Sequence, residues 1–183
     1  MHNEEELISG CCRGDRKSQR KLYELFSKKM LIVCLRYSKE RQEAEDVLQE
    51  SFIKVFNNLK NFRKESSLEF WIKRIVINTA LNFQRNKLYL YPMVEVQNAP
   101  LAPEKELILS DYNFQDLLKL IQSLPSGCQV IFNLHAIEGY QHKEIAAMIG
   151  VSEGTVKSQY FRAKALLQNM IVEMDKIKYE KFR

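Results

Sequence analysis

The chain has 183 residues, of which 45% are hydrophobic, a net charge of +5, and only 6 glycines and 4 prolines. This length suits one domain or two small ones, and a composition rich in helix formers and poor in turn formers predicts an all-α fold. No apolar run approaches the roughly 18 residues of a membrane span, and the acidic start is unlike a secretion signal, so a cytoplasmic protein without membrane insertion is expected.

Helical periodicity runs from about Leu7 to Arg85 and predicts a first helical domain at residues 1–87. Within residues 42–62 one side is apolar, and the opposite side carries Asp46, Glu50 and Ile53, with Gln49 at its margin. Acidic faces are usually just solvated, whereas an Ile in the middle of one is more typical of a partner-binding surface. The pattern alone leaves both interpretations open.

The next segment, FRKESSLEFWIKRIVINTALNFQRNK at residues 62–87, is basic and aromatic. A charged, hydroxyl-rich loop at residues 63–67 precedes a helix that is apolar on most sides. On this helix a narrow polar arc begins near Trp71 and consists of Arg74, Asn78, Asn82 and Arg85. Aromatic, Arg and Asn side chains suit unstacked single-stranded bases. A core helix with one exposed polar stripe is the alternative.

A linker is predicted at residues 88–110, because residues 88–103 hold three of the four prolines and keep no helical period. It separates two basic segments. Residues 61–90 carry 6 Lys/Arg against 2 Asp/Glu, and residues 151–183 carry 7 against 4, whereas residues 91–150 carry 3 against 7. This distribution fits two separate contacts with a polyanion.

A second helical domain is predicted at residues 111–183, with helices at about 112–123, 128–137 and 142–149 before a long last helix. Gly139 and Gly150 can adopt the left-handed backbone that ends a helix or makes a tight turn. Ser152 is a good N-cap for the last helix. Two helices joined by a short glycine-containing turn constitute a helix-turn-helix.

The last helix separates into two faces at 100° per residue from Val156. Its apolar residues fall on one side, and the other side carries Gly154, Thr155, Lys157, Ser158, Phe161 and Arg162. A solvated face rarely needs an exposed Phe and a first-turn Gly. A DNA-reading face uses both, since Gly lets the backbone approach phosphate and Phe meets a thymine methyl. A generic helical hairpin is the alternative.

Side chains for catalysis or cofactor binding form no known pattern. The four cysteines have no zinc-site spacing and are expected to be reduced, and the three histidines are scattered and indicate neither a metal site nor a catalytic pair. Phosphate-binding and hydrolase motifs are missing as well. We therefore expect neither an enzyme nor a bound cofactor or metal.

Three stretches together resemble the sigma-70 family of bacterial RNA polymerase sigma factors, specifically the extracytoplasmic-function (ECF) subgroup, which keeps only regions 2 and 4. They are EAEDVLQESFIKVFNNLKNF, FWIKRIVINTALNFQR and LPSGCQVIFNLHAIEGYQHKEIAAMIGVSEGTVKSQYFRAKALL. The resemblance implies a region 2 helical bundle and a region 4 helix-turn-helix joined by a flexible linker. It also implies that the chain binds core RNA polymerase and directs promoter-specific initiation. A helix-turn-helix regulator that is not a polymerase subunit is the alternative.

The resemblance further implies partners and residue roles. Core polymerase would be bound through its β′ clamp and β flap, with the clamp meeting Asp46, Gln49, Glu50 and Ile53. Promoter DNA would be read twice. The −10 element would meet Phe62, Arg63, Lys64, Ser66, Ser67, Trp71, Arg74, Asn78, Asn82 and Arg85, with Phe62, loop 63–67 and Asn78 capturing a flipped base. The −35 element would meet Ser152, Gly154, Thr155, Lys157, Ser158, Phe161 and Arg162. An anti-sigma factor is a further expected partner.

Overall fold

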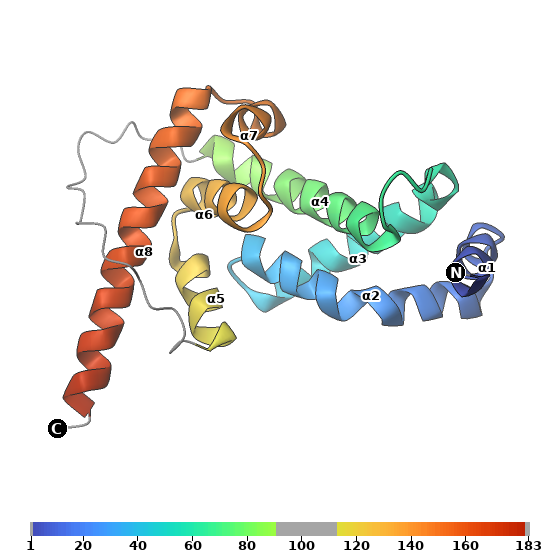
Figure 1. Cartoon of the computed structure of the whole chain (residues 1–183), viewed down its shortest axis with the longest axis horizontal. Helices are drawn as coiled ribbons and strands as arrows, with labels where there is room; N and C mark the ends of the chain where they lie inside the picture. Colours follow the sequence, from blue (N-terminus) through green and yellow to red (C-terminus); the bar gives the residue numbers. More distant parts are fainter. Residues whose placement is uncertain (1, 91–112, 182–183) are drawn as a thin grey trace. The chain divides into compact units, whose positions relative to one another are not determined.

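The computed structural model describes the backbone of residues 2–90 and 113–181 and the side chains of residues 4–84 and 113–176. Every regular element in these ranges is helical, which confirms the all-α prediction (Figure 1). The chain divides into two compact units, one ending at Phe83 and the other beginning at Gln84. None of the described helices combines the length and apolar character that crossing a bilayer requires.

The first unit contains α1 (His2–Cys12), α2 (Arg16–Tyr37), α3 (Arg41–Asn58), the 3₁₀ turn η1 (Leu59–Asn61) and most of α4 (Leu68–Leu90). Helix α2 begins at a cap in which the Asp15 carboxylate accepts the backbone N–H groups of Lys17 and Ser18. These two hydrogen bonds satisfy donors that have no partner within the helix. Helix α4 extends to Leu90, three residues past the predicted end of the first domain, and the rest of the predicted linker, 91–110, lies outside the described residues.

One apolar core holds the first unit together. Helix α2 contributes Leu22, Met30, Val33, Cys34 and Tyr37, and α3 contributes Ala44, Val47, Leu48, Phe52 and Val55. Helix α4 adds Leu68, Ile72, Val76, Ile77 and Ala80. Each of these sets recurs every three or four residues, which places it on one face of its helix. The polar faces of α3 and α4 are thereby turned away from the core.

The second unit contains α5 (Phe114–Ser123), α6 (Ser126–Phe132), the π-helical turn η3 (Asn133–Ile137), α7 (His142–Ile149) and α8 (Glu153–Lys181). Helices α5, α6 and α7 all pack against the long α8 (Figure 1). Between α5, α6 and α8 lies a core of Leu120, Leu124, Cys128, Ala163, Leu167 and Ile171. Helix α8 is therefore the scaffold of this unit.

The helix boundaries of this unit are close to those predicted. Helix α7 has the predicted bounds, whereas α6 begins at Ser126, two residues before the prediction. The earlier start follows from Pro125, whose carbonyl accepts the N–H of Gln129 and so closes the first turn. The last residues of the predicted 128–137 helix form the π-helical turn η3. Tyr112, at the predicted start of α5, lies outside the described residues.

The predicted helix-turn-helix is confirmed at α7 and α8. Gly150 ends α7 with a φ of 74°, in the left-handed region that glycine enters without a steric penalty. Two residues later the Ser152 hydroxyl accepts the N–H of Thr155 at 3.0 Å, as an N-cap does. Gly139 is also left-handed, with a φ of 81°, and turns the chain between η3 and α7. The turn at Gly150 and the cap at Ser152 together set where α8 begins and which of its sides faces outward.

Candidate nucleic-acid interfaces

The outer face of α8 is exposed along its first three turns. Ser152, Gly154, Lys157, Ser158 and Phe161 are exposed, and Thr155 and Arg162 are partly exposed. The Phe161 side chain is 56% exposed. On the opposite side the predicted buried stripe is confirmed at Val156, Ala163, Leu167 and Ile171, whereas Tyr160, Met170 and Met174 are only partly buried. We refer to the exposed and partly exposed set on this side as the reading face: Ser152, Gly154, Thr155, Lys157, Ser158, Phe161 and Arg162.

Hydrogen bonds within the reading face hold several of its polar side chains. The hydroxyls of Ser152 and Thr155 lie 2.7 Å apart, and the hydroxyl of Ser158 donates to the carbonyl oxygen of Thr155 at 3.0 Å. The ammonium of Lys157 lies 2.8 Å from a carboxylate oxygen of Glu153, one turn earlier. This contact lowers the pKa of the Glu153 carboxyl. A phosphate that binds Lys157 must therefore compete with Glu153.

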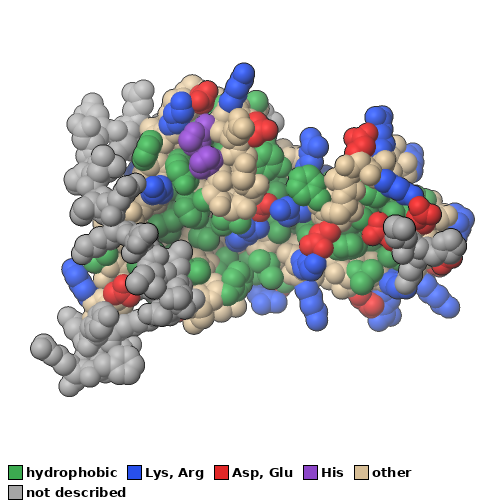
Figure 2. All heavy atoms as spheres, viewed as in Figure 1, with side chains coloured by type: hydrophobic (Ala, Val, Ile, Leu, Met, Phe, Trp, Pro, Cys, Tyr) green, Lys and Arg blue, Asp and Glu red, His purple; other side chains and the backbone are tan. Residues whose placement is uncertain are grey.

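Two histidines, His135 and His142, pack against Tyr160 of α8, next to the reading face. The rings of His135 and His142 stack at 4.2 Å, and the ring of Tyr160 meets His135 edge-on at 4.6 Å. Figure 2 shows the two imidazoles, in purple, side by side. His135 Nδ1 lies 2.8 Å from the carbonyl oxygen of Tyr140, while His142 Nε2 is buried without a hydrogen-bond partner. His135 and His142 lie apart in the sequence but are neighbours in the structure, because the turn at Gly139 brings η3 and α7 together.

The first unit carries a polar pocket of about 380 Å³ between α3, η1 and α4. It is lined by Lys54, Asn58, Asn61, Trp71, Ile75, Asn78, Thr79 and Asn82. Four of these side chains are carboxamides, which offer both hydrogen-bond donors and acceptors, and the indole adds an aromatic surface. A wall of this kind can bond the edge of a nucleotide base and stack on its face. We refer to it as the strand pocket.

The strand pocket gathers some of the predicted −10 residues and not others. Trp71, Asn78 and Asn82 line it together, because they lie at helical spacing along α4. Arg74 is exposed but does not line the pocket, and the side chain of Arg85 lies outside the described residues. The wall of the pocket that α3 and η1 supply was not among the predicted residues. The signal was present, since Lys54, Asn58 and Asn61 recur at spacings of four and three residues.

The loop at 63–67 follows Phe62, whose ring contacts that of Trp71 at 5.4 Å between centroids. This contact places the loop beside the strand pocket, although none of its residues lines the pocket. Lys64 has a φ of 58° and forms an ion pair with Glu5 of α1. The hydroxyl of Ser67 accepts the N–H of Phe70 at 3.2 Å in the first turn of α4. Arg63 and Ser66 are exposed. The loop is thus anchored at several points.

The acidic outer face of α3 adjoins the strand pocket. Asp46, Gln49 and Ile53 are exposed, Glu50 is half-buried, and the Ile53 side chain is 56% exposed. Their spacing of three, one and three residues puts all four on one side of α3. An apolar side chain that is exposed amid carboxylates has no role in the core of this unit. We refer to these four residues as the clamp face.

An apolar groove lies in the second unit between α5, α6, η3 and α8, with a volume of about 400 Å³. Its lining is mostly aliphatic and aromatic: Leu117, Leu120, Ile121, Phe132, Ile137, Tyr160, Lys164, Leu167, Gln168 and Ile171. The groove was not predictable from the sequence, because its walls come from four segments whose packing against one another does not follow from the hydrophobic period of any one of them. On α8 the groove is lined by residues of the predicted apolar side, among them Tyr160, Leu167 and Ile171.

Comparisons with known proteins agree with the two-unit organisation. Residues 22–88 match the family described as Sigma-70 region 2, and residues 114–167 match Sigma-70, region 4. The chain is 28% identical to the ECF RNA polymerase sigma-E factor of Haemophilus influenzae, covering 92% of this chain and 95% of that protein. It is 29% identical to the RNA polymerase sigma-H factor of Pseudomonas aeruginosa, covering 93% and 95%. A solved structure of the sigma factor RpoE with the anti-sigma factor NepR from Bartonella quintana is similar in fold, with a TM-score of 0.53, 22% identity, and coverage of 85% and 97%.

Proposed function

The chain belongs to the sigma-70 family, and we propose that it is an ECF-type sigma factor that binds core RNA polymerase and directs initiation at promoters with −35 and −10 elements. The observation that carries this proposal is that the two family matches fall on two separate units, each with a surface whose chemistry suits nucleic acid. The strand pocket lies within the region 2 match, and the reading face lies within the region 4 match. A subunit of this kind needs no catalytic group of its own, and we place its activity in the cytoplasm.

The reading face suits duplex DNA. A helix of a helix-turn-helix lies in the major groove and presents its N-terminal residues to base edges. At the N-terminus of α8 this position is held by the capping residue Ser152 and by Thr155 and Ser158, with Phe161 and Arg162 one turn further on. Arg bonds guanine through two atoms at once, and Phe contacts the thymine methyl. We assign −35 recognition to this face, with Lys157 on phosphate.

The strand pocket suits a single strand. Its carboxamides and indole can hold one unstacked base, which a duplex does not offer. Capture of such a base on one strand favours opening of the duplex, because the captured base is removed from pairing. We therefore assign −10 recognition to Asn78, Asn82 and Trp71, with Phe62 and loop 63–67 closing one side of the site.

Two further surfaces suit core polymerase. The clamp face combines the carboxylates of Asp46 and Glu50 with the exposed apolar side chain of Ile53, and protein-binding surfaces join apolar and polar groups in this way. We assign it to the β′ clamp. The apolar groove of the second unit suits an amphipathic helix laid between α5 and α8, and we assign it to the β flap. Because a solved relative is named as a complex with an anti-sigma factor, we further propose that such a protein is a partner of this chain.

Run-off transcription with purified core polymerase on a library of random promoter fragments tests the proposal. The chain is expected to support initiation from a subset of fragments that share two sequence elements at fixed spacing. Core polymerase without the chain provides the background. Duplex binding without any initiation would reject the sigma assignment and would favour a helix-turn-helix regulator instead.

A further inference from the structure

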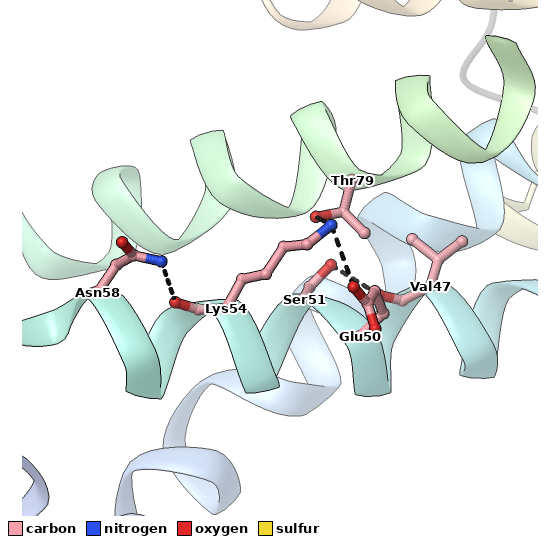
Figure 3. A network of polar contacts seen from close by, with 6 residues as sticks. All are labelled: Val47, Glu50, Ser51, Lys54, Asn58 and Thr79. Atoms are coloured by element: carbon pink, nitrogen blue, oxygen red, sulfur yellow. Dashed lines mark hydrogen bonds and ion pairs between the residues drawn. The ribbon is translucent and has the colours of Figure 1, made fainter.

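Lys54 of α3 lies between the clamp face and the strand pocket. Its ammonium is 3.2 Å from a carboxylate oxygen of Glu50 and 3.5 Å from the hydroxyl oxygen of Thr79 on α4. Figure 3 shows the Lys54 side chain extending from α3 to α4 between these two partners. Glu50 belongs to the clamp face, and Thr79 belongs to the wall of the strand pocket. One side chain therefore touches both surfaces.

Within the strand pocket, Lys54 has a chemistry that none of the other lining residues has. Of the described residues that line the pocket, it alone carries a charge. An ammonium has three hydrogen-bond donors and no acceptor, so it binds best to an oxygen that carries negative charge. A single-stranded nucleic acid presents such oxygens on every phosphate. The Lys54 side chain is 38% exposed, so a phosphate can reach it without a change of fold.

In the free chain this ammonium already has an anionic partner. The Glu50–Lys54 pair spans one helical turn in the favourable order, with the carboxylate nearer the helix N-terminus. A phosphate at the pocket must displace Glu50 from Lys54 and must also approach a carboxylate about 3 Å from the same ammonium. Both effects weaken strand binding. They disappear when Glu50 pairs with a cation of another protein.

From this geometry we infer that Lys54 binds a phosphate of the captured strand, and that Glu50 withholds it until core polymerase engages the clamp face. The inference rests on the proposed function, because it assigns Glu50 to the polymerase. It adds a DNA-binding residue to the strand pocket and makes strand capture by this residue depend on polymerase binding. Asn58 supports the arrangement, since its amide donates to the carbonyl oxygen of Lys54 at 2.8 Å and holds the next turn of α3 in place.

The first experiment measures binding of a short, fluorescein-labelled, mixed-sequence single strand to the free chain by anisotropy at low salt. Glu50→Gln is expected to tighten binding about twofold, which is the factor that an i,i+4 ion pair of this type imposes. In the Lys54→Gln background the same change is expected to have a smaller effect, because only the repulsion between the Glu50 carboxylate and the strand remains to be removed. The matched control is Glu45→Gln, which releases Arg41 from a similar pair on α3 at 2.8 Å but lines no part of the pocket.

The second experiment uses holoenzyme assembled with saturating core polymerase. Lys54→Gln is expected to lower the slope of log affinity against log salt by about 0.7, the contribution of one single-strand phosphate contact. Lys54→Arg keeps the charge and should keep the slope. Glu50→Gln should give no further gain, because the polymerase has already taken up the carboxylate. Circular dichroism melting checks that each variant folds.

Two results would overturn the inference. One is an equal gain in single-strand affinity from Glu50→Gln and from Glu45→Gln, which would show that the gain comes only from the change in net charge. The other is an unchanged salt slope for Lys54→Gln in a holoenzyme that still captures the strand. Both outcomes leave the sigma assignment intact. Failure of the wild-type chain to initiate with core polymerase would instead refute the proposed function, while the free-chain measurement would still decide whether Glu50 restrains Lys54.

Discussion

His135 and His142 stack their imidazole rings at 4.2 Å directly behind the helix that carries the reading face. The cluster also includes Tyr160, and His142 is further surrounded by the charges of Lys157 and Glu153 on α8. Burial lowers the pKa of His142 below its usual value of 6.5, the positive charges of His135 and Lys157 lower it further, and Glu153 opposes them. The fold therefore favours the neutral imidazole at this position.

This pair predicts a stability that depends on pH. The unfolded chain takes up a proton on His142 at a higher pH than the folded chain does, so the free energy of unfolding falls as the pH drops from about 6.5 through the lowered pKa. The melting temperature of the second unit should decrease between about pH 7.5 and about pH 5.5. Differential scanning calorimetry over this range measures the change.

His142→Gln supplies the control for this prediction, since glutamine is polar but does not titrate. The variant should lose a large part of the pH dependence. The lowered pKa values of Asp15 and Glu153 do not interfere, because those carboxylates lose their stabilising contacts only in the acid range, below about pH 4.5. An identical pH profile in the variant would remove His142 as the cause.

Arg162 and Lys157 should differ in what they contribute to duplex binding. Arg162→Ala is expected to weaken binding to a −35 duplex by about 1–3 kcal/mol and to relax the preference at one base pair, if the guanidinium reads a base edge. Lys157→Ala should weaken all sequences alike and should reduce the salt slope by about 0.9, because an ammonium on phosphate carries no sequence information. Anisotropy titrations on a panel of single-base variants separate the two effects.

The reading face was predictable because it follows from one helix alone. A period of 100° per residue is enough to separate Phe161 from Val156, and Gly150 with Ser152 fixes where the helix begins. Of the strand pocket, only the wall formed by α4 was predictable. Trp71 and Asn78 lie on one helix, but the opposite wall comes from Lys54 and its neighbours on α3, and the pairing of two helices is not encoded in the period of either.

The histidine pair and the apolar groove were not predictable for the same reason. His135 and His142 meet only because a π-helical turn and a left-handed glycine reverse the chain between them. The walls of the groove come from four segments, so it exists only once the helices have packed. Contacts between elements depend on crossing angles and on the volumes of the side chains at each contact, neither of which a single helix period contains.

Asn78 should control selectivity at the −10 element. Its exposed carboxamide lies in the strand pocket beside Asn82, and Asn78→Ala removes a donor and an acceptor without opening the core. We expect weaker discrimination among single-strand variants by holoenzyme, with unchanged affinity for core polymerase. Asn57→Ala is the matched control, since Asn57 is exposed on α3 but does not line the pocket. Unaltered discrimination in the Asn78 variant would exclude it from base contact.

Lys64 should tolerate glycine and reject a β-branched residue. Its φ of 58° lies in the left-handed region, which costs a residue with a Cβ roughly 1–2 kcal/mol. Lys64→Gly relieves that strain but gains freedom in the unfolded chain, so stability should stay within about 1 kcal/mol of wild type. Lys64→Val should lose about 1 kcal/mol or more, because branching at Cβ disfavours this backbone further. Equal losses in Lys64→Val and Arg63→Val, compared by urea unfolding, would show that the backbone at Lys64 is not strained.

Ile53 should contribute to polymerase binding and not to the stability of the free chain. Ile53 is 56% exposed and lies at one end of the clamp face, so Ile53→Ala removes less buried surface from the first unit than a core substitution would. If polymerase covers it, the loss of two to three buried carbon groups should weaken binding to core by about 1–2 kcal/mol. Ile32→Ala is the matched control, because Ile32 is 41% exposed on α2, outside the clamp face. Competition between wild-type and variant chains for limiting core polymerase measures the difference, and an equal loss for both variants would move the interface away from α3.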